Sequence, residues 1–456
     1  MGALTGAPTG GTGRSRRVST WSGTAHAHPA AFHAPADESE LAAVVAAANG
    51  SGERIRVIGA GHSFTPVALG TGTMISLDAL SGIVAVDAAT RRVRFRAGTR
   101  LRDIPALLAP HGLALANQGD VDPQSLAGAI STGTHGTGLG FTGFARMVTG
   151  LTLLTADGAR RELSRAADPD VFDLARLSLG VLGVITEIEL ACVPRFDVVA
   201  REQSEPFDDL LATFVARSAQ CDHLEFYWFP HTDRALVKTN VRVAPGQAPP
   251  AGVSAARPRR RLAQLLNEEV LDNGALRAIC EIGHRAPALV PFFNRAAAEA
   301  ASNRLYRAPA HEAFVSPRRV RFTEMEYAVP LAAGPEVLAR IRDLIEERRW
   351  RISFPLEGRT TAADDVPLST ATGRESMYIA CHRFFRDDSA EYFRRIEQIC
   401  REFDGRPHWG KVHTLTAAEL GAVYPRFEDF RTLRARLDPH AVVGSAYTDS
   451  LFAPER

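Results

Sequence analysis

Ile55-Arg56-Val57-Ile58-Gly59-Ala60-Gly61-His62-Ser63 is the stretch that decides the fold. Ile55–Ile58 predicts a short strand, which runs directly into two glycines and a histidine. A strand that ends in Gly-x-Gly suggests a Rossmann dinucleotide site, but Phe64 occupies the third glycine position and no long helix pattern follows. The glycines instead favour a loop whose backbone comes close to phosphate oxygens, so that several N–H groups point at one anion.

Two more glycine-rich segments lie downstream. Gly128–Gly138 offers small residues, hydroxyls and many amides, and Ser178–Ile185 would let the backbone pass closely along a flat ring or an adenine. Two such loops on one domain are expected to grip a pyrophosphate from both sides. From the residues alone, the alternative that these glycines only form loops stays open.

The pattern of elements around these segments favours an α+β fold over a regular βαβ array. Asp37 and Glu40 predict a capping box for a helix over Glu38–Asn49, ended by Gly50. The expected strands and hairpins are Ile83–Asp87 with Arg92–Arg96, Leu151–Thr155 with Ala159–Leu163, Val181–Leu190, His223–Phe229, Arg234–Val241, Arg321–Val329, Arg351–Leu356 and Met377–Ala380. A further helix is expected near Leu101–Leu108, residues 117–140 are expected to lack periodic structure, and residues 262–304 read as a helical insert.

Composition excludes several classes of function. The 456 residues carry a formal net charge of +1, which gives no electrostatic case for binding nucleic acid. Five widely spaced cysteines without a CxxC pair argue against a disulfide framework or a metal site and favour the cytoplasm. No run of 18 apolar residues predicts a membrane span, although the apolar patch Leu289–Phe293 leaves peripheral association with a membrane open.

Four segments, spread along nearly the whole chain, carry a resemblance to a known family by their residues and their order. They are Gly59–Ser63, Asn117–Gly138, Glu357-Gly358-Arg359 with Ala362–Asp365, and Arg406–Lys411. In this order the chain resembles the aldonolactone oxidases, the L-gulono-1,4-lactone and D-arabinono-1,4-lactone oxidases, with alditol oxidases as near relatives. All belong to the FAD flavoproteins of the vanillyl-alcohol-oxidase type.

The resemblance implies a domain organisation. An FAD-binding domain of two subdomains is expected over residues 21–196, with a C-terminal return over 412–456. A substrate (cap) domain is expected over 197–411, and residues 1–20, rich in Gly, Thr and Ser, are expected to form a disordered tail.

The resemblance also implies that FAD is bound covalently, through an 8α-histidyl bond from His62. Such a bond needs an unprotonated imidazole nitrogen beside an activated flavin methyl group. Without the resemblance, His62 reads as a solvated loop histidine. The other residues expected to contact FAD are Gly59, Ala60, Gly61, Ser63, Asn117, Asp120, Gly128, Ser131, Thr132, Gly133, Thr134, His135, Gly136, Gly138, Gly180, Gly183, Val184 and Ile185.

Oxidation of an alcohol by a flavin needs a proton acceptor and positive charge near the developing alkoxide. Glu357 and Arg359 stand two apart on a predicted strand, so both side chains face the same side. Lys411 would add a second cation, and the resemblance maps a substrate-contacting histidine onto His382. The alternatives are a surface Glu–Arg pair, a surface lysine and a core histidine.

The resemblance implies oxidation of the C2 hydroxyl of an aldono-1,4-lactone, with reoxidation by O2 or by a cytochrome or quinone. An alditol or other secondary-metabolite alcohol oxidase is the alternative. Phe384 stands where alditol oxidases place a small hydroxyl residue, which argues against a long polyol substrate. A flavin-binding subunit without turnover is a third reading, which the joint presence of Glu357, Arg359 and Lys411 disfavours. A glycine, Gly358, is unusual between Glu357 and Arg359 in this family, and it is expected to loosen the strand that carries both residues.

Overall fold

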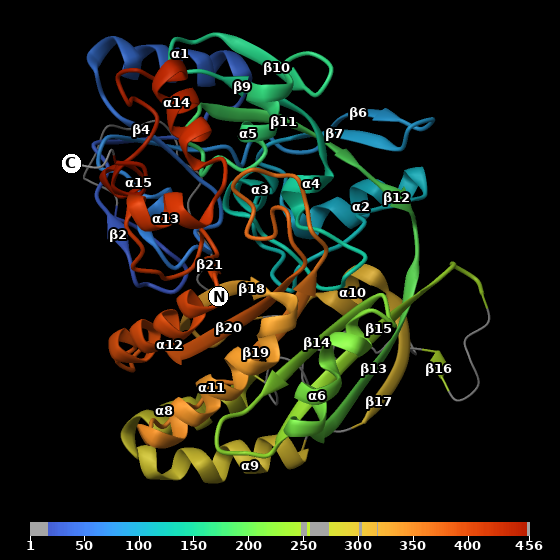
Figure 1. The fold of residues 1–456 in the computed structure, drawn as a ribbon. Helices are drawn as coiled ribbons and strands as arrows, with labels where there is room; N and C mark the ends of the chain where they lie inside the picture. The colour runs from blue at the N-terminus through green and yellow to red at the C-terminus, as the bar shows by residue number, and fades with distance from the viewer. Residues whose placement is uncertain (1–16, 248–252, 256–272, 301–302, 317, 454–456) are drawn as a thin grey trace.

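The computed structural model describes residues 17–247, 253–255, 273–300, 303–316 and 318–453. Figure 1 shows two bodies, one above the other. The upper body contains the blue and cyan N-terminal elements together with the red C-terminal helices, and the lower body contains a large sheet with helices outside it. Residues 1–16 of the predicted tail, and residues 262–272 and 301–302 of the predicted helical insert, lie outside the described residues.

Two sheets form the centre of the upper body. The parallel sheet has the order β3 (Ala31–His33), β5 (Thr73–Ser76), β4 (Ile55–Ile58). The antiparallel sheet has the order β10 (Arg160–Ser164), β9 (Val148–Leu154), β11 (Val184–Ala191), β7 (Arg92–Arg96), β6 (Ile83–Asp87). Two short pairs add β1 (Val18–Ser19) with β2 (His26–Ala27), and β8 (Leu113–Ala114) with β12 (Val193–Pro194). Both predicted hairpins are confirmed, whereas β1 lies inside the predicted disordered tail.

The helices of the upper body are short, except the first. They are α1 (Glu38–Ser51), η1 (Pro66–Ala68), η2 (Leu101–Asp103), α2 (Ile104–Leu108), η3 (Ala109–His111), α3 (Leu126–Thr132), α4 (Phe144–Met147) and α5 (Pro169–Ala175). Asp37 caps α1 by accepting from the Glu40 amide at 2.8 Å, as predicted, but the helix ends at Gly52 rather than Gly50. The prediction that residues 117–140 lack periodic structure was wrong for α3, which Ser125 caps by accepting from the Gly128 amide.

The lower body is built on one nine-stranded sheet. In spatial order its strands are β16 (Ser254–Ala255), β17 (Arg304–Pro309), β13 (Asp197–Pro206), β15 (Arg234–Val243), β14 (His223–Trp228), β19 (Leu356–Thr361), β20 (Ser376–Phe384), β18 (Phe322–Pro330) and β21 (Arg406–Pro407). The helices of this body are α6 (Phe207–Ser218), α8 (Asn273–Arg285), η5 (Pro287–Leu289), α9 (Val290–Ala300), α10 (Ala310–Phe314), η6 (Leu331–Ala333), α11 (Gly334–Glu347) and α12 (Ala390–Glu402). Helices α6, α11 and α12 bury apolar side chains, and their residues belong to the main hydrophobic core.

The predicted strand Arg351–Leu356 was wrong, because β19 begins only at Leu356. The backbone carbonyls before it accept from side chains instead of from a neighbouring strand. Asn294 donates to the Ile352 carbonyl at 2.8 Å, and Arg383 donates to the Arg351 carbonyl at 2.9 Å. Pro355 also has no N–H for a ladder.

The C-terminal helices α13 (Ala417–Val423), α14 (Phe427–Leu437) and α15 (Ala446–Leu451) return to the upper body, where they lie beside β4 in Figure 1. The Ile55 amide donates to the Val442 carbonyl at 2.7 Å, and the Gly444 amide donates to the Ile55 carbonyl at 3.0 Å. The C-terminus therefore pairs with the strand that leads to His62. Within the described residues, no helix has the length and apolar character needed to cross a membrane.

Candidate active site

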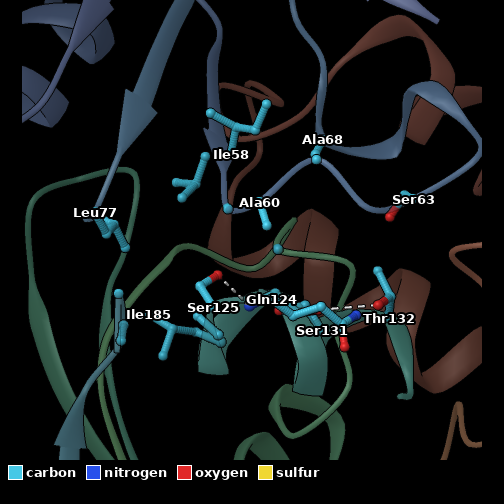
Figure 2. Close-up of a pocket in the computed structure, with 18 of the residues that line it drawn as sticks. Ile58, Ala60, Ser63, Ala68, Leu77, Gln124, Ser125, Ser131, Thr132 and Ile185 are labelled. Carbon is cyan, nitrogen blue, oxygen red and sulfur yellow. Dashed lines mark hydrogen bonds between the residues drawn. The ribbon is translucent and has the colours of Figure 1, made fainter. Parts of the chain in front are cut away.

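The three glycine-rich segments meet at one cavity of about 870 Å³. Figure 2 shows it between the loop that carries Ala60 and Ser63 and the end of α3 with Ser131 and Thr132, with Leu77 and Ile185 at one side. The predicted cofactor residues that line it are Gly59, Ala60, Gly61, His62, Ser63, Gly128, Ser131, Thr132, Gly180, Gly183, Val184 and Ile185.

The loop after β4 presents a row of unpaired donors to this cavity. Among the described residues, nothing accepts a hydrogen bond from the amides of residues 60–63. Gly61 holds φ at +69°, and a side chain at Gly59 would place its Cβ 2.3 Å from Ser125 Oγ. Consecutive free N–H groups in a turn form an anion-binding concavity, so the loop fits a diphosphate.

Four predicted cofactor residues line neither this cavity nor the next one. Asn117 donates to the Thr137 carbonyl at 3.3 Å, and a Cβ at Gly136 would lie 2.6 Å from Asn117 Oδ1. Gly133 ends α3 with φ +79°, and the Gly138 amide donates to the Thr360 carbonyl at 2.7 Å. These residues shape the loop and join it to β19.

Arg56 also lines the first cavity, although the sequence did not mark it. Its buried guanidinium donates to the backbone carbonyls of Val67 at 2.6 Å and Gly180 at 2.8 Å, and to that of Leu179. Burial lowers the pKa of Arg56 to about 9. The side chain thus ties β4 to the loop that leads into β11.

A second cavity of about 770 Å³ adjoins the first, and both are lined by His62, Ser63, Gln124 and Thr132. Aromatic and charged side chains dominate its wall. The predicted residues that line it are His62, Ser63, Asp120, Thr132, Thr134, His135, Glu357, Arg359, His382 and Lys411. The structure therefore brings all four predicted catalytic side chains together next to His62.

Arg359 is the centre of a buried charge network on one wall of the second cavity. It pairs with Glu357 on the same strand, with Glu225 at 3.2 Å and with Asp120 at 3.5 Å. Arg318 donates from its Nε to the other oxygen of Asp120, Oδ2, at 3.1 Å. Burial raises the pKa of Glu357 to about 8 against the pull of Arg359, and buried Arg359 keeps a pKa well above its usual range because Glu357 lies beside it.

Lys411 is the centre of a second network. It pairs with Glu324, and its Nζ lies 4.0 Å from Glu326 Oε2. Burial opposes its charge, but Glu324 and Glu326 hold the pKa of Lys411 above its usual value. His135 Nε2 lies 3.2 Å from Glu326 Oε1, and its Nδ1 lies 2.8 Å from the Gly136 carbonyl.

His135, Glu326 and His408 place one possible metal-ligand atom each within 4.8 Å of one another, the one such group among the described residues. The Lys411 ammonium lies beside Glu326. This positive charge opposes a metal cation. His408 Nδ1 accepts from the Gly410 amide at 3.0 Å, and burial lowers the pKa of His408 to about 3.

His62 lies where the two cavities meet, and its imidazole stacks on Trp21 with ring centroids 5.3 Å apart. Burial lowers the pKa of His62 to about 4, and Lys411 and Arg100 act in the same direction. The ring is therefore neutral at pH 7 and keeps one nitrogen lone pair.

His382 has a defined tautomer. A backbone carbonyl only accepts, so the 3.0 Å bond to the Pro355 carbonyl places the ring proton on Nδ1. Nε2 is then an acceptor that lies 3.7 Å from Glu324 Oε1. Phe384, two residues further on β20, packs in a cluster with Phe64, Phe322 and Phe354 and is not among the residues that line the second cavity, so its position gives no support to the argument that it excludes a long polyol.

The sequence missed the partners that fix the predicted residues. Glu225 and Arg318 hold Arg359 and Asp120 from distant strands and loops, and nothing in the local sequence pairs them. Glu324 and Glu326 could have been predicted to act together, because they stand two apart on β18, as Glu357 and Arg359 do on β19. His408 stood inside the Arg406–Lys411 motif but was not given a role.

Two family models match the chain. One, described as D-arabinono-1,4-lactone oxidase, matches residues 188–451, and the other, described as FAD binding domain, matches residues 29–164.

Individual proteins agree with these matches. An L-gulono-1,4-lactone dehydrogenase of Mycobacterium tuberculosis is 40% identical over 96% of this chain and 99% of its own length. An alditol oxidase of Streptomyces sp. is 32% identical over 93% of this chain and 96% of its own length. The solved structure of a solvent-stable cholesterol oxidase superposes with a TM-score of 0.80 at 20% identity, covering 96% of this chain and 97% of that one. The expected α+β fold is thereby confirmed.

Proposed function

Because the chain belongs to the D-arabinono-1,4-lactone oxidase family of FAD-dependent oxidoreductases, we propose that it oxidises the C2 hydroxyl of an aldono-1,4-lactone to a 2-keto lactone. The product tautomerises to an ascorbate-like enediol. The observation that carries this proposal is the buried Glu357–Arg359 pair in a polar cavity that shares His62 with the glycine-lined cavity.

The first cavity suits the FAD expected from the family. The free amides of residues 60–63 would hold the diphosphate, and Gly180, Gly183 and Ile185 would let the flat part of the cofactor lie against the backbone. When bound, FAD accepts the hydride from the carbon that bears the hydroxyl. The neutral His62 imidazole is the group we propose for the covalent 8α-histidyl attachment.

Glu357 takes the hydroxyl proton in this proposal. A base works best when its pKa lies near the working pH, and burial brings the pKa of Glu357 to about 8. Its Oε1 lies in the ion pair with Arg359, and within the described part of the chain its Oε2 accepts no hydrogen bond, so Oε2 is the oxygen we propose to accept the substrate hydroxyl.

Arg359 and Lys411, which both line the second cavity, supply positive charge. Fixed charges in a buried site stabilise a developing alkoxide without reorganisation. His382 Nε2 accepts a hydrogen bond from a second hydroxyl group and so orients the lactone ring. Trp21, Phe64 and Phe322 cover the apolar side of the cavity and exclude water.

The test of the substrate is anaerobic bleaching of the flavin. The purified holoprotein is mixed with aldono-1,4-lactones, including L-gulono- and D-arabinono-1,4-lactone, and with xylitol and sorbitol. Rapid loss of the oxidised flavin band with a lactone supports the proposal. Bleaching by the alditols alone would instead support an alditol oxidase. If no compound in the panel bleached the flavin, the result would support a flavin-binding subunit without turnover.

The acceptor is tested on the bleached protein. Mixing with air-saturated buffer or with a quinone or cytochrome shows which acceptor restores the oxidised band, so the assay separates an oxidase from a dehydrogenase. The His62 attachment is tested by acid denaturation, where flavin must stay on the wild-type polypeptide and leave the His62→Ala variant.

A further inference from the structure

We propose that Trp21 is the positioning residue that orients the His62 imidazole for bond formation with the flavin. This inference rests on the covalent attachment proposed above. It assigns a role to a segment, residues 18–27, that lies at the edge of the predicted disordered tail.

The first observation is that the His62 ring lacks a polar anchor. Within the described ranges, no side chain or backbone group makes a hydrogen bond to either of its ring nitrogens. His382 and His408, in contrast, are each fixed by a bond between Nδ1 and a backbone group. The indole of Trp21 lies against the His62 ring with an interplanar angle of 18°, so stacking sets the plane of the imidazole.

The second observation is that Trp21 is itself held firmly. Its amide donates to the Gly61 carbonyl at 2.7 Å, directly before His62. Its ring meets Phe322 edge-on at 5.3 Å and Phe64 at 6.4 Å between centroids. Thr24 adds a bond from its hydroxyl to the Phe64 carbonyl at 3.1 Å. The turn between β1 and β2 therefore clamps the loop on both sides of His62.

A nucleophile whose direction is fixed before reaction avoids the entropic cost of finding that direction. The imidazole is free to turn about its Cα–Cβ and Cβ–Cγ bonds unless a neighbour restrains it. Burial lowers the pKa of His62 to about 4 and keeps a lone pair available at neutral pH. Trp21 then limits where that lone pair points.

Formation of the covalent bond between His62 and the flavin breaks two bonds and releases one electron pair. One C–H bond of the flavin 8-methyl group and the imidazole N–H bond break, and a bond forms between the methyl carbon and the imidazole nitrogen. The two hydrogens leave as protons, and the electron pair of the C–H bond reduces the flavin. Dioxygen accepts that pair and restores the oxidised cofactor.

The experiment measures the rate of attachment rather than turnover. Apoprotein made under riboflavin limitation is mixed with FAD in air, and intact-protein mass and in-gel flavin fluorescence follow covalent flavin over time. We expect Trp21→Leu to slow attachment by about tenfold, which corresponds to ~1.4 kcal/mol and lies within what an aromatic pair contributes. Trp21→Phe keeps a stacking ring and should retain most of the rate. Trp350→Leu, which removes another partly buried indole near α11, should match the wild type.

Separate readouts distinguish the possible failures. FAD affinity of each apoprotein before attachment, and its melting temperature, should be similar for Trp21→Leu and Trp21→Phe. Equal attachment rates in Trp21→Leu and wild type would overturn the role of Trp21. Slowing of both Trp21 variants in proportion to weaker FAD binding would also overturn it, in favour of a structural role. Absence of covalent flavin in the wild type would instead remove the attachment itself.

Discussion

Glu357 and Arg359 stand two apart on β19, and both are buried in the wall of the second cavity. Arg359 has two further partners outside this strand, because Glu225 and Asp120 also face its guanidinium. Arg359 thus stays charged, while Glu357 has to compete with two other carboxylates for that charge. This competition, together with burial, keeps the proton affinity of Glu357 high.

The pH dependence of flavin reduction follows from this arrangement. Glu357 acts as a base only when ionised, and burial raises its pKa to about 8. We expect the rate of anaerobic flavin reduction to fall about tenfold for each pH unit below that pKa. Stopped-flow reduction between pH 5.5 and 9.5 measures this. Glu357→Gln should reduce the flavin at least about a hundredfold more slowly, and a steep wild-type profile that survives in Glu357→Gln would assign the ionisation to another group.

Arg359 is predicted to act on the transition state. Removal of one charged donor from a buried site lowers rates by roughly 10²–10³, so Arg359→Ala should slow flavin reduction by that factor. Arg359→Lys should recover only part of the loss, because lysine cannot contact Glu225 and Glu357 with separate nitrogens of one planar group. Arg348→Ala, at a half-exposed surface pair with Glu391, is the matched control. A reduction rate within threefold of wild type in Arg359→Ala would remove Arg359 from the site.

The sequence predicted the residues of the candidate site better than it predicted the side chains that pair with them. Two residues on one strand face share a side by geometry alone, which is why Glu357 with Arg359 was visible. Glu225 lies more than a hundred positions away and reaches Arg359 only because β14 pairs with β19. Such pairs depend on strand order, which local patterns do not encode.

Gly358, between Glu357 and Arg359, is required by packing on the other face of the strand. A Cβ at Gly358 would lie 2.1 Å from the Phe226 ring, because that ring fills the space on the opposite face of β19. The strand is not loosened by its glycine, contrary to expectation, since β14 and β20 pair with it on both sides.

Gly358→Ala is therefore predicted to destabilise the protein by ~1–3 kcal/mol, the usual range for overpacking. Phe226→Leu shortens the opposing side chain, so the double variant should be more stable than the sum of the single effects predicts. Chemical denaturation of the three variants measures the coupling. Gly50→Ala, at an exposed helical position with open space around it, should not destabilise the protein. Strict additivity in the double variant would contradict the proposed contact.

The correctly predicted hairpins and β4 have local causes, whereas the segment wrongly predicted as a strand, Arg351–Leu356, owes its conformation to tertiary contacts. The hairpins and β4 follow from alternation and turn residues. Ile352 and Phe354 alternate with polar neighbours as a strand does, and both are buried. The backbone carbonyls of this segment nevertheless accept from side chains, which the alternation does not reveal: Ile352 accepts from Asn294, Arg351 from Arg383 and Pro355 from His382.

In the whole molecule, the site depends on contact between the two bodies. The Thr137 hydroxyl donates to the Leu224 carbonyl at 2.6 Å and accepts from the Thr360 amide at 3.2 Å, so the loop after α3 bridges β14 and β19. The Gly138 amide completes this junction at the Thr360 carbonyl. Residues that would hold the cofactor and residues that would act on the substrate are therefore held in register by one short loop.

His223 makes this junction sensitive to acid. Its Nδ1 donates to the Thr137 carbonyl at 2.8 Å, and its Nε2 accepts from Arg242 Nε at 3.4 Å. Protonation of Nε2 would remove that acceptor and place an imidazolium beside a guanidinium. Burial accordingly lowers the pKa of His223 to about 4.

Because the folded-state pKa lies below the ordinary value, the unfolded chain binds more protons between about pH 6.5 and 4. The stability that neutral His223 supplies is complete above about pH 6.5 and is lost as the pH falls through this range, by up to ~3 kcal/mol. Melting temperatures measured from pH 8 to 4 should therefore decline most steeply below 6.5, and less steeply in His223→Gln, which cannot titrate. His440→Gln, at an exposed position after α14, should follow the wild-type slope. Equal slopes in His223→Gln and wild type would show that acid acts on the protein elsewhere.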